Sequence, residues 1–421
     1  MRCWPPAWSA SLERSESSSD AITVEVIARL ALMISLVALS IDAMLPALGQ
    51  IGEDLGATRV GDRQLIVTTL LLGLGLGQLL YGPLSDSVGR KPAIYAGLVL
   101  FMAGCGLSIL ATDFRWMLAG RFLQGLGVAG PRTVTVALVR DQYEGRAMAR
   151  VMSFVMGVFI VVPALAPSLG QWILSFAHWR WIFGSFLGLS LVVTLWFGLR
   201  QPETLPPERR HPFSLRRVGR AVRETVSHRI SLGYTLTAGL IFGAFVSYLS
   251  LAQPIFQVQY GLGERFPLYF AALALAIGAA AWLNGRLVVK LGMQLLTELA
   301  LWVLSGLSIL FLAVVMTLGE QPPLWALMGY LLPGFFCMGF LFGNMNALAI
   351  QPLGHIAGSA AAVIGALSTA ISLLLATLVG RGYDGSVVPL VGAFALCSTA
   401  ALGVMRRTER GAGRTPAESV P

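Results

Sequence analysis

The feature that most constrains the fold of this chain is a series of uncharged apolar segments, each about twenty residues long. A helix of that length spans the ~30 Å hydrocarbon core of a bilayer. The composition agrees, because 56% of the 421 residues are hydrophobic and only 12% are charged, about half the charge of a soluble protein. The sequence therefore indicates a polytopic membrane protein and excludes a pair of soluble domains.

The apolar segments are expected to be helices, because the bilayer core offers no water to an open backbone. The predicted fold class is thus an all-α polytopic membrane protein with twelve transmembrane helices. We place the spans at approximately residues 27–48, 63–83, 91–111, 115–140, 147–170, 179–199, 229–252, 267–288, 294–317, 323–349, 357–380 and 385–405.

One long polar connection divides these spans into two sets of six. It covers residues 200–228, is rich in proline and arginine, and separates a first half at 27–199 from a second half at 229–405. Its segment 214–227 has the pattern of a basic amphipathic helix that could lie on anionic lipid. A solvated linker is the alternative that the sequence leaves open.

Positive charge is distributed unequally over the loops. With the N-terminus in the cytoplasm, that side receives Arg90, Arg140 and the basic cluster of residues 200–229. Because positively charged loops stay in the cytoplasm, we expect an inner (plasma) membrane protein with both termini inside. Residues 1–26 are then a disordered cytoplasmic tail and residues 406–421 a second tail. The net charge of +9 reflects this topology rather than nucleic-acid binding.

The most specific motif lies in the short loop between the second and third spans. It has the spacing G-x-L-x-D-x-x-G-R-K, formed by Gly82, Leu84, Asp86, Gly89, Arg90 and Lys91. This pattern resembles the loop 2–3 signature of the major facilitator superfamily of transporters. The resemblance implies two pseudo-symmetric six-helix halves and a monomer. A polar hairpin with positive-inside arginines is the plainer interpretation.

A degenerate copy of the motif follows the eighth span. Gly285, Leu287 and Gly292 repeat the glycine–leucine–glycine spacing, while Val289 stands at the place of the aspartate. A match at the equivalent position of the second half indicates a duplication. A parallel repeat about an axis along the membrane normal gives the 6+6 facilitator arrangement.

Two charged residues are predicted to lie at similar depth inside the first and fourth spans. An ionisable residue within a span is a functional candidate by default, which singles out Asp42. A buried arginine needs acceptors and keeps its proton, so we expect Arg121 to pair with Asp42. An aspartate tied to another helix or lying nearer the surface is the alternative. Arg121 and Gln124 form R-x-x-Q-G, which resembles the span 4 signature of drug:proton antiporters, where the arginine is held to assist proton transfer.

Arg132 extends the polar pattern of the fourth span. It follows Arg121 by eleven residues, which places it about 20° from the same helix face and about 16 Å deeper. Two arginines on one stripe suggest a polar pathway, and Arg132 could favour an acidic or carboxylate-bearing substrate. The alternative is that Arg132 extends to the membrane surface or bonds a backbone carbonyl near Pro131.

Two further features of the first half are gating candidates. Asp141, at the end of the fourth span, could join Asp86 and Arg90 in a charge cluster. By resemblance, such a cluster latches the halves in the outward-open state; a static surface network is the alternative. Pro163 and Pro167 are expected to kink the fifth span, as a variant of the family's glycine–proline signature.

Polar residues of the second half complete the candidate site. Spans 7 and 10 are the counterparts of spans 1 and 4, and they carry Tyr248, Gln253, Asn344 and Asn346. We therefore expect these four side chains to face a central cavity and to contribute to substrate binding.

Several stretches narrow the resemblance to the Bcr/CflA branch of drug:proton antiporters. They are Leu45-Pro46-Ala47-Leu48 after Asp42, Trp179-Arg180-Trp181-Ile182-Phe183, Pro254, Asn284-Gly285-Arg286-Leu287 and Pro352-Leu353-Gly354. The resemblance implies multidrug efflux, and hence antibiotic resistance, by proton-coupled antiport of amphipathic drugs or small metabolites. Asp42 would be the proton and substrate site. A facilitator that imports a small metabolite is the alternative.

Nothing in the sequence favours an enzyme. There is no phosphate-binding loop and no nucleophile elbow, and the four histidines are dispersed. Cys3, Cys105, Cys337 and Cys397 form no C-x-x-C pair, so we expect no metal site. The expected partners are a small-molecule substrate and membrane lipid, without nucleic acid. Protons are the only coupling agent, and no other cofactor is expected.

Overall fold

The structure is a computed structural model that describes residues 9–57, 59–143, 145–319 and 321–412. Within these ranges every regular element is a helix, and ten segments are long and apolar enough to cross a membrane. One of them, Leu324–Arg381, contains two helices, and the apolar stretch Val161–Leu174 belongs to a further long helix. Twelve long helices therefore occupy the positions of the predicted spans.

Six long helices form the first half. They are α1 (Ser9–Asp42), α4 (Leu65–Val88), α5 (Arg90–Ile109), α6 (Phe114–Gln142), α7 (Gly145–Leu174) and α8 (Arg180–Arg200). Two short helices, α2 (Leu48–Asp54) and α3 (Val60–Arg63), connect α1 to α4.

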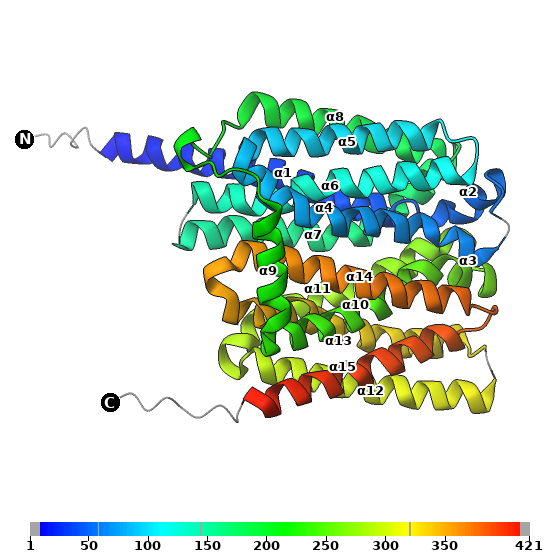
Figure 1. The fold of residues 1–421 in the computed structure, drawn as a ribbon. Helices are drawn as coiled ribbons and strands as arrows, with labels where there is room; N and C mark the ends of the chain where they lie inside the picture. Colours follow the sequence, from blue (N-terminus) through cyan, green and yellow to red (C-terminus); the bar gives the residue numbers. More distant parts are fainter. Residues whose placement is uncertain (1–8, 58, 144, 320, 413–421) are drawn as a thin grey trace, which may run out of the picture.

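Six long helices form the second half, after the connecting helix α9 (Leu215–Ser227). They are α10 (Arg229–Gln253), α11 (Phe266–Leu291), α12 (Met293–Leu318), α13 (Leu324–Ile350), α14 (Ala357–Arg381) and α15 (Val388–Ala412). Figure 1 shows the two halves side by side, with α9 crossing from the first to the second. The start of α1 and the end of α15 lie at the same end of the molecule (Figure 1). The halves meet mainly where α4 packs on α14 and α7 packs on α11.

Helix α1 is longer than the predicted first span. It begins at Ser9, so residues 9–26, which we assigned to a tail, are helical. No proline or glycine occurs between Ser9 and Asp42, so nothing in the chain interrupts the helix. The part apolar enough to cross a membrane begins at Val24. At the other end of the chain, α15 likewise continues to Ala412, beyond the predicted end of the last span.

Glycines allow the helices of the first half to pack closely. A side chain on Gly125 would collide with the Leu70 carbonyl of α4, and one on Gly127 would collide with the backbone of α5 at Phe101. Helix α6 therefore lies against both neighbours at backbone distance, as expected for small residues at helix interfaces in membranes.

The degenerate repeat found in the sequence corresponds to the same turn in both halves. Gly89 ends α4 and precedes α5 with φ 109° and ψ 162°, and Gly292 ends α11 and precedes α12 with φ 78° and ψ 157°. Positive φ favours glycine, which explains why glycine occupies both turns although Val289, Met293 and Gln294 stand in the second half at the places of the charged motif residues. The shared turn supports the pseudo-symmetry of the two halves.

Helix α9 is the amphipathic helix expected from segment 214–227. Its buried residues, Ala221 and Thr225, lie against the second half, where α9 contacts α10 and α14. The Glu224 carboxylate is hydrogen-bonded to the His355 ring, in the short 3-10 helix (Gln351–Ile356) just before α14. The arginines on the other face of α9 are exposed: Arg216, Arg217, Arg220 and Arg223.

Candidate functional site

A cavity of about 330 Å³ lies between the two halves. Helices α1, α4, α6 and α7 line it from the first half, and α10, α11, α13 and α14 line it from the second. Most of the wall is apolar, and aromatic rings gather on the side of the second half. The rings in the wall belong to Phe242, Phe245, Tyr248, Phe270, Phe335 and Phe342. This wall suits an apolar or aromatic molecular surface.

Polar side chains interrupt the apolar wall at a few places. Besides the Tyr248 hydroxyl, they belong to Asp42, Gln78, Arg132, Asn346, Ser368 and Thr369. Among the lining residues that the structure describes, Asp42 is the one carboxylate and Arg132 the one guanidinium. One ionisable acid and one ionisable base of the described residues therefore face the cavity.

Asp42 lies at the point where α1 stops. Pro46 explains this end, because proline lacks an N–H and its ring collides with the carbonyl four residues earlier, which is that of Asp42. A turn and a short 3-10 helix (Leu45–Ala47) follow. The Asp42 side chain is 5% exposed and borders the cavity. In the described ranges, no group donates a hydrogen bond to its carboxylate or forms an ion pair with it.

Arg121 does not form the predicted ion pair with Asp42. Its buried guanidinium donates to the carbonyl oxygens of Ser40 at 2.7 Å and Ile66 at 3.1 Å, and to Oε1 of Gln124 at 2.6 Å. Because α1 ends at Asp42, the Ser40 carbonyl lacks the N–H of a further helical turn, and Arg121 replaces it. The prediction rested on depth alone and missed the end of the helix.

Gln124 extends this network to a third helix. Its Nε2 donates to the Gly104 carbonyl at 3.1 Å and to Ser108 Oγ at 2.9 Å, both in α5. Arg121 and Gln124 are both absent from the cavity wall. Together they join α1, α4, α5 and α6 behind the wall and fix the end of α1 that carries Asp42.

Arg132 is the charged residue of α6 that reaches the cavity. Its side chain is half-buried and lines the wall. Over the part of the chain that the structure describes, no acceptor or carboxylate pairs with its guanidinium. The bond to a carbonyl near Pro131, which was one alternative for this residue, is therefore not formed, and the guanidinium is available to a molecule in the cavity.

The four polar candidates of the second half separate into two groups. Tyr248 and Asn346 line the cavity, whereas Gln253 and Asn344 do not. Asn344 exchanges two hydrogen bonds with Asn284 of α11, at 3.0 and 2.9 Å. Gln253 is the last residue of α10 and lies beyond the end of the cavity wall.

Three polar lining residues were missed by the sequence analysis. Gln78 of α4 lies against Gly365 of α14, where a side chain larger than glycine would collide with its amide. Ser368 and Thr369 of α14 lie in the next turn. A search for every polar residue inside a span would have found Gln78. Ser368 and Thr369 carry a weaker signal, because hydroxyls inside a helix often bond their own backbone, as Thr369 does with Gly365.

The proline candidates of the fifth span occupy different positions. Pro163 lines the cavity, whereas Pro167 is buried in α7. Helix α7 continues through both prolines from Gly145 to Leu174. Gly170, one turn further on, leaves room for the carbonyl of Ala43 in the broken end of α1.

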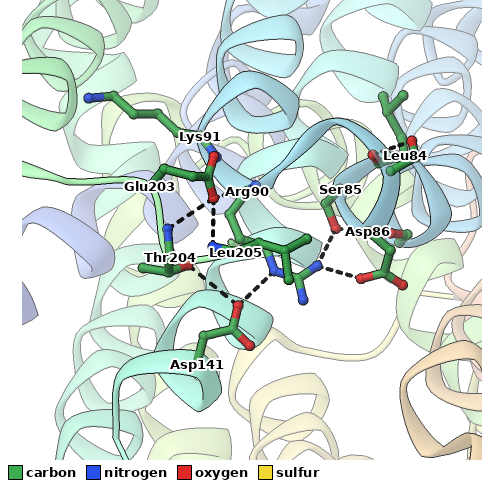
Figure 2. Close-up of polar contacts among 11 residues, drawn as sticks. Leu84, Ser85, Asp86, Arg90, Lys91, Asp141, Glu203, Thr204 and Leu205 are labelled. Carbon is green, nitrogen blue, oxygen red and sulfur yellow. Dashed lines mark hydrogen bonds and ion pairs between the residues drawn. The ribbon is translucent and has the colours of Figure 1, made fainter. Parts of the chain in front are cut away.

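The loop motif forms the predicted charge cluster within the first half (Figure 2). Arg90 donates to Asp86 Oδ1 at 2.5 Å, to Asp141 Oδ2 at 2.8 Å and to Ser85 Oγ at 2.9 Å. Arg90 is only 4% exposed, so the cluster joins the ends of α4, α5 and α6. Among the described residues, its ion pairs do not extend to the second half.

The remaining motif residues shape the turn around this cluster. Lys91 donates from Nζ to the Gly198 carbonyl at 2.9 Å, which ties α5 to α8. Leu84 packs partly buried against the apolar core, and nothing lies within 4 Å of a side chain added at Gly82. A side chain at Gly89 would lie 2.6 Å from Oε2 of Glu203, so this glycine is required by space as well as by φ.

Glu203 of the connection is a component that the sequence analysis missed. It accepts hydrogen bonds from the backbone N–H groups of Arg90 at 2.9 Å and Lys91 at 3.0 Å, at the N-terminus of α5 (Figure 2). Burial raises the pKa of Glu203, but the N–H groups of Leu205, Arg90, Lys91 and Thr204 outweigh burial and hold the pKa below its usual value. A carboxylate at a helix N-terminus is favourable. Glu203 lies in an irregular segment, where the sequence has no helical or strand periodicity that would have predicted this contact.

The two ends of the cavity differ. At the end near α3, Gly61 lies against the Gly380 carbonyl of α14, and Gln64 fills the space that a side chain on Gly380 would need. The halves are thus in contact there. Toward the other end, where α9 lies, the lining residue Asn346 is exposed. Access to the cavity is therefore from the side of α9.

The sequence is similar to those of known transporters and drug-resistance proteins. Residues 30–405 match the profile of the Major Facilitator Superfamily. The chain is 28% identical over 365 residues to a bicyclomycin resistance protein homolog of Haemophilus influenzae, covering 85% of this chain and 89% of that one. It is 30% identical over 381 residues to a chloramphenicol resistance protein of Pseudomonas aeruginosa, covering 84% of each.

A solved structure shows the same fold at lower sequence identity. The xylose transporter XylE from E. coli, in a partially occluded inward open conformation, aligns with a TM-score of 0.72 and 14% identity, over 91% of this chain and 99% of that chain. The predicted fold class is confirmed, and the relatives are transporters rather than enzymes. The relatives named for bicyclomycin and chloramphenicol resistance bear out the resemblance to the Bcr/CflA branch, and the chain belongs to the Major Facilitator Superfamily of transporters.

Proposed function

We propose that this protein exports amphipathic drugs or small metabolites and that an inward flow of protons drives the export. The observation that carries the proposal is the apolar cavity between the halves, with Asp42 as its one carboxylate among the described lining residues. An ionised carboxylate in such surroundings is costly, so a proton or a polar group of a substrate lowers the free energy by neutralising it. The drug-resistance relatives support export as the direction.

Proton and substrate exclude one another in this mechanism. Ionised Asp42 attracts the polar part of a substrate, and protonated Asp42 releases it. Rocking of one half against the other exposes the cavity to one side of the membrane at a time. Arg121 acts through the backbone, because it holds the end of α1 from which the Asp42 side chain projects.

The orientation follows from charge. We place the end that carries α9 in the cytoplasm of a cell with this protein in its inner membrane, so that both termini are inside and the cavity opens inward. The loop arginines and the exposed basic face of α9 support this orientation. The working unit is a monomer, since the cavity is built by one chain.

The charge cluster is assigned a gating role. Asp86 is 52% exposed at the open end, so it is free to meet the second half when that end closes. Arg90 holds Asp86 in place by pairing with Asp141 on the opposite side. Closure at this end and opening at the end near α3 would then alternate.

Inverted membrane vesicles with an acidic interior test the function. Chloramphenicol, florfenicol, bicyclomycin and a sulfonamide are added in turn, and interior pH is followed by fluorescence. We expect alkalinisation with at least one drug, and loss of this response in Asp42→Asn, which keeps the shape of the side chain but cannot ionise. Asp62→Asn is the matched control, because Asp62 is exposed outside the cavity.

The same assay separates export from import. Drug-driven alkalinisation that persists in Asp42→Asn would reject Asp42 as the proton site. If no drug moves protons in folded wild-type protein, drug export is wrong. Uptake of labelled metabolites by right-side-out vesicles would then test a facilitator-type importer.

A further inference from the structure

We propose that the cavity binds a carboxylate-bearing amphipathic molecule and that Arg132 holds its anionic group. The proposal rests on the proposed transport function and names the substrate class of the same cavity. It starts from a charge that the protein itself leaves unpaired: Arg132 lines the wall, and no described residue neutralises it. Charges taken out of water are normally paired within the protein, and Arg132 is half-buried.

The chemistry of arginine selects the anion. A guanidinium remains protonated and presents its N–H groups as a planar fork, which matches the two oxygens of a carboxylate. The one carboxylate of the described wall, Asp42, makes no ion pair with Arg132. A ligand that carries its own carboxylate would supply the missing partner.

A second polar group also lacks a partner. The hydroxyl of Tyr248 is buried, with the residue 1% exposed, and makes no hydrogen bond in the structure. Tyr248 lines the cavity from α10 of the second half, whereas Arg132 lines it from α6 of the first. A ligand whose polar atoms reach both residues would bridge the halves and satisfy both groups.

The aromatic wall determines the rest of the ligand. Phe342 packs edge-on against Phe245, with ring centroids 5.4 Å apart, and Tyr248 packs edge-on against Phe335 at 4.6 Å. These rings offer an apolar surface for an aromatic or branched hydrocarbon body. A neutral amide of the same shape offers the guanidinium of Arg132 one carbonyl acceptor and no charge, so its contact is weaker than that of a carboxylate. The cavity should therefore distinguish an acid from its neutral analogue.

Binding of 1-naphthoic acid and 1-naphthamide to the full-length protein in nanodiscs tests this. The two probes share a ring system and differ in charge, and calorimetry at pH 7.4 gives both affinities. We expect the acid to bind at least about tenfold more tightly, which corresponds to about 1.4 kcal/mol. Arg132→Gln should abolish the preference, and Arg132→Lys should retain part of it.

Arg140→Gln is the matched control, because Arg140 lies on the same helix but is exposed outside the cavity. Equal affinities in wild type would overturn the proposal without any variant. A preference that survives Arg132→Gln, or that Arg140→Gln removes equally, would also overturn it. Drug-driven proton movement without acid preference rejects the substrate class and keeps the export function. Acid preference that depends on Arg132, without drug-driven proton movement, supports Arg132 and rejects drug export.

Discussion

Asp42 and Arg121 are both buried and ionisable, yet their surroundings differ. Arg121 has three acceptors and Asp42 has no partner among the described residues. A group whose bonds are all satisfied within the protein stabilises the fold, whereas an unpaired charge next to a cavity is available for ligand or proton. We therefore expect substitutions of the two residues to have different effects on the protein.

Replacement of Arg121 should lower stability. Arg121→Gln leaves the carbonyls of Ser40 and Ile66 without a donor, and each unpaired buried group costs about 1–3 kcal/mol. The unfolding temperature of the purified protein should fall by roughly 5 °C, whereas Asp42→Asn should leave it nearly unchanged. Thermal unfolding followed by thiol-reactive dye fluorescence measures both.

The Asp42→Asn background provides the control for Arg121. If Arg121 acts on the backbone of α1, Arg121→Gln should destabilise Asp42→Asn as strongly as wild type. A clearly smaller drop in the double variant would contradict the structure, because it would mean that Arg121 mainly neutralises Asp42.

The sequence identifies the polar residues within the spans, but it does not predict the direction in which each side chain points. Asn344 and Asn346 lie two positions apart on one helix, so they project about 200° apart. Both were predicted to face the cavity, and only Asn346 does. Which of two such residues faces inward depends on the rotation of α13, and its uniformly apolar surroundings leave that rotation undefined in the sequence.

The connection between the halves is bound to helices of both halves. Its first part is bound to the first half through Glu203 at the start of α5, and through the N–H of His211, which donates to the Asp86 carbonyl at 2.9 Å. Its second part, α9, is bound to α10 and α14. The amphipathic pattern in the sequence offered α9 as one of two possibilities, beside a solvated linker. The path of the irregular part was not predictable, because it depends on single contacts.

Glu203 should contribute to stability in a pH-dependent way. Its pKa lies below the usual value of 4.5 in the folded protein, so the ionised form is favoured by folding. That stability is present at neutral pH and is lost as the pH falls from about 4.5 through the lower folded pKa. Glu203→Gln should lower the unfolding temperature by roughly 2 °C at pH 7, since a lost cap costs about 1 kcal/mol.

Acid pH is the internal control for Glu203. The difference in unfolding temperature between Glu203→Gln and wild type should shrink toward pH 4, where the wild-type carboxylate begins to be protonated and loses its charge. Glu208→Gln, an exposed glutamate of the same connection, should show no difference at either pH. A difference for Glu203→Gln that does not change with pH would reject the ionised cap.

The whole molecule is well predicted from hydropathy, because bilayer thickness fixes helix length and the duplicated glycine turn reveals the repeat. The conformational state is not predictable in this way. It depends on contacts between halves, such as Gly61 against Gly380, and those contacts change when the protein moves while the sequence stays the same.

A larger residue at the closed end should shift the conformational equilibrium. Gly380→Val requires Gln64 to move, because that amide fills the space of the new side chain. The end near α3 should open and the opposite end should close. Maleimide labelling of Asn346→Cys, in a background without other cysteines, should therefore become slower by several-fold.

Gly392→Val is the matched control, since nothing lies within 4 Å of a side chain at Gly392 of α15. It should leave labelling unchanged. Unaltered labelling in a folded Gly380→Val protein would contradict coupled movement of the two ends.

The connection is bound to both halves, so its length limits how far the halves can move apart. His211 is bound to the first half, and α9, which begins at Leu215, is bound to the second. The chain between them extends by at most about 3.6 Å per residue, or about 14 Å in all. While both anchors hold, this length sets the furthest distance to which the two halves can separate at these points. The size of the opening, and with it the largest cargo that can enter, is therefore determined in part by a few residues that never touch the cargo.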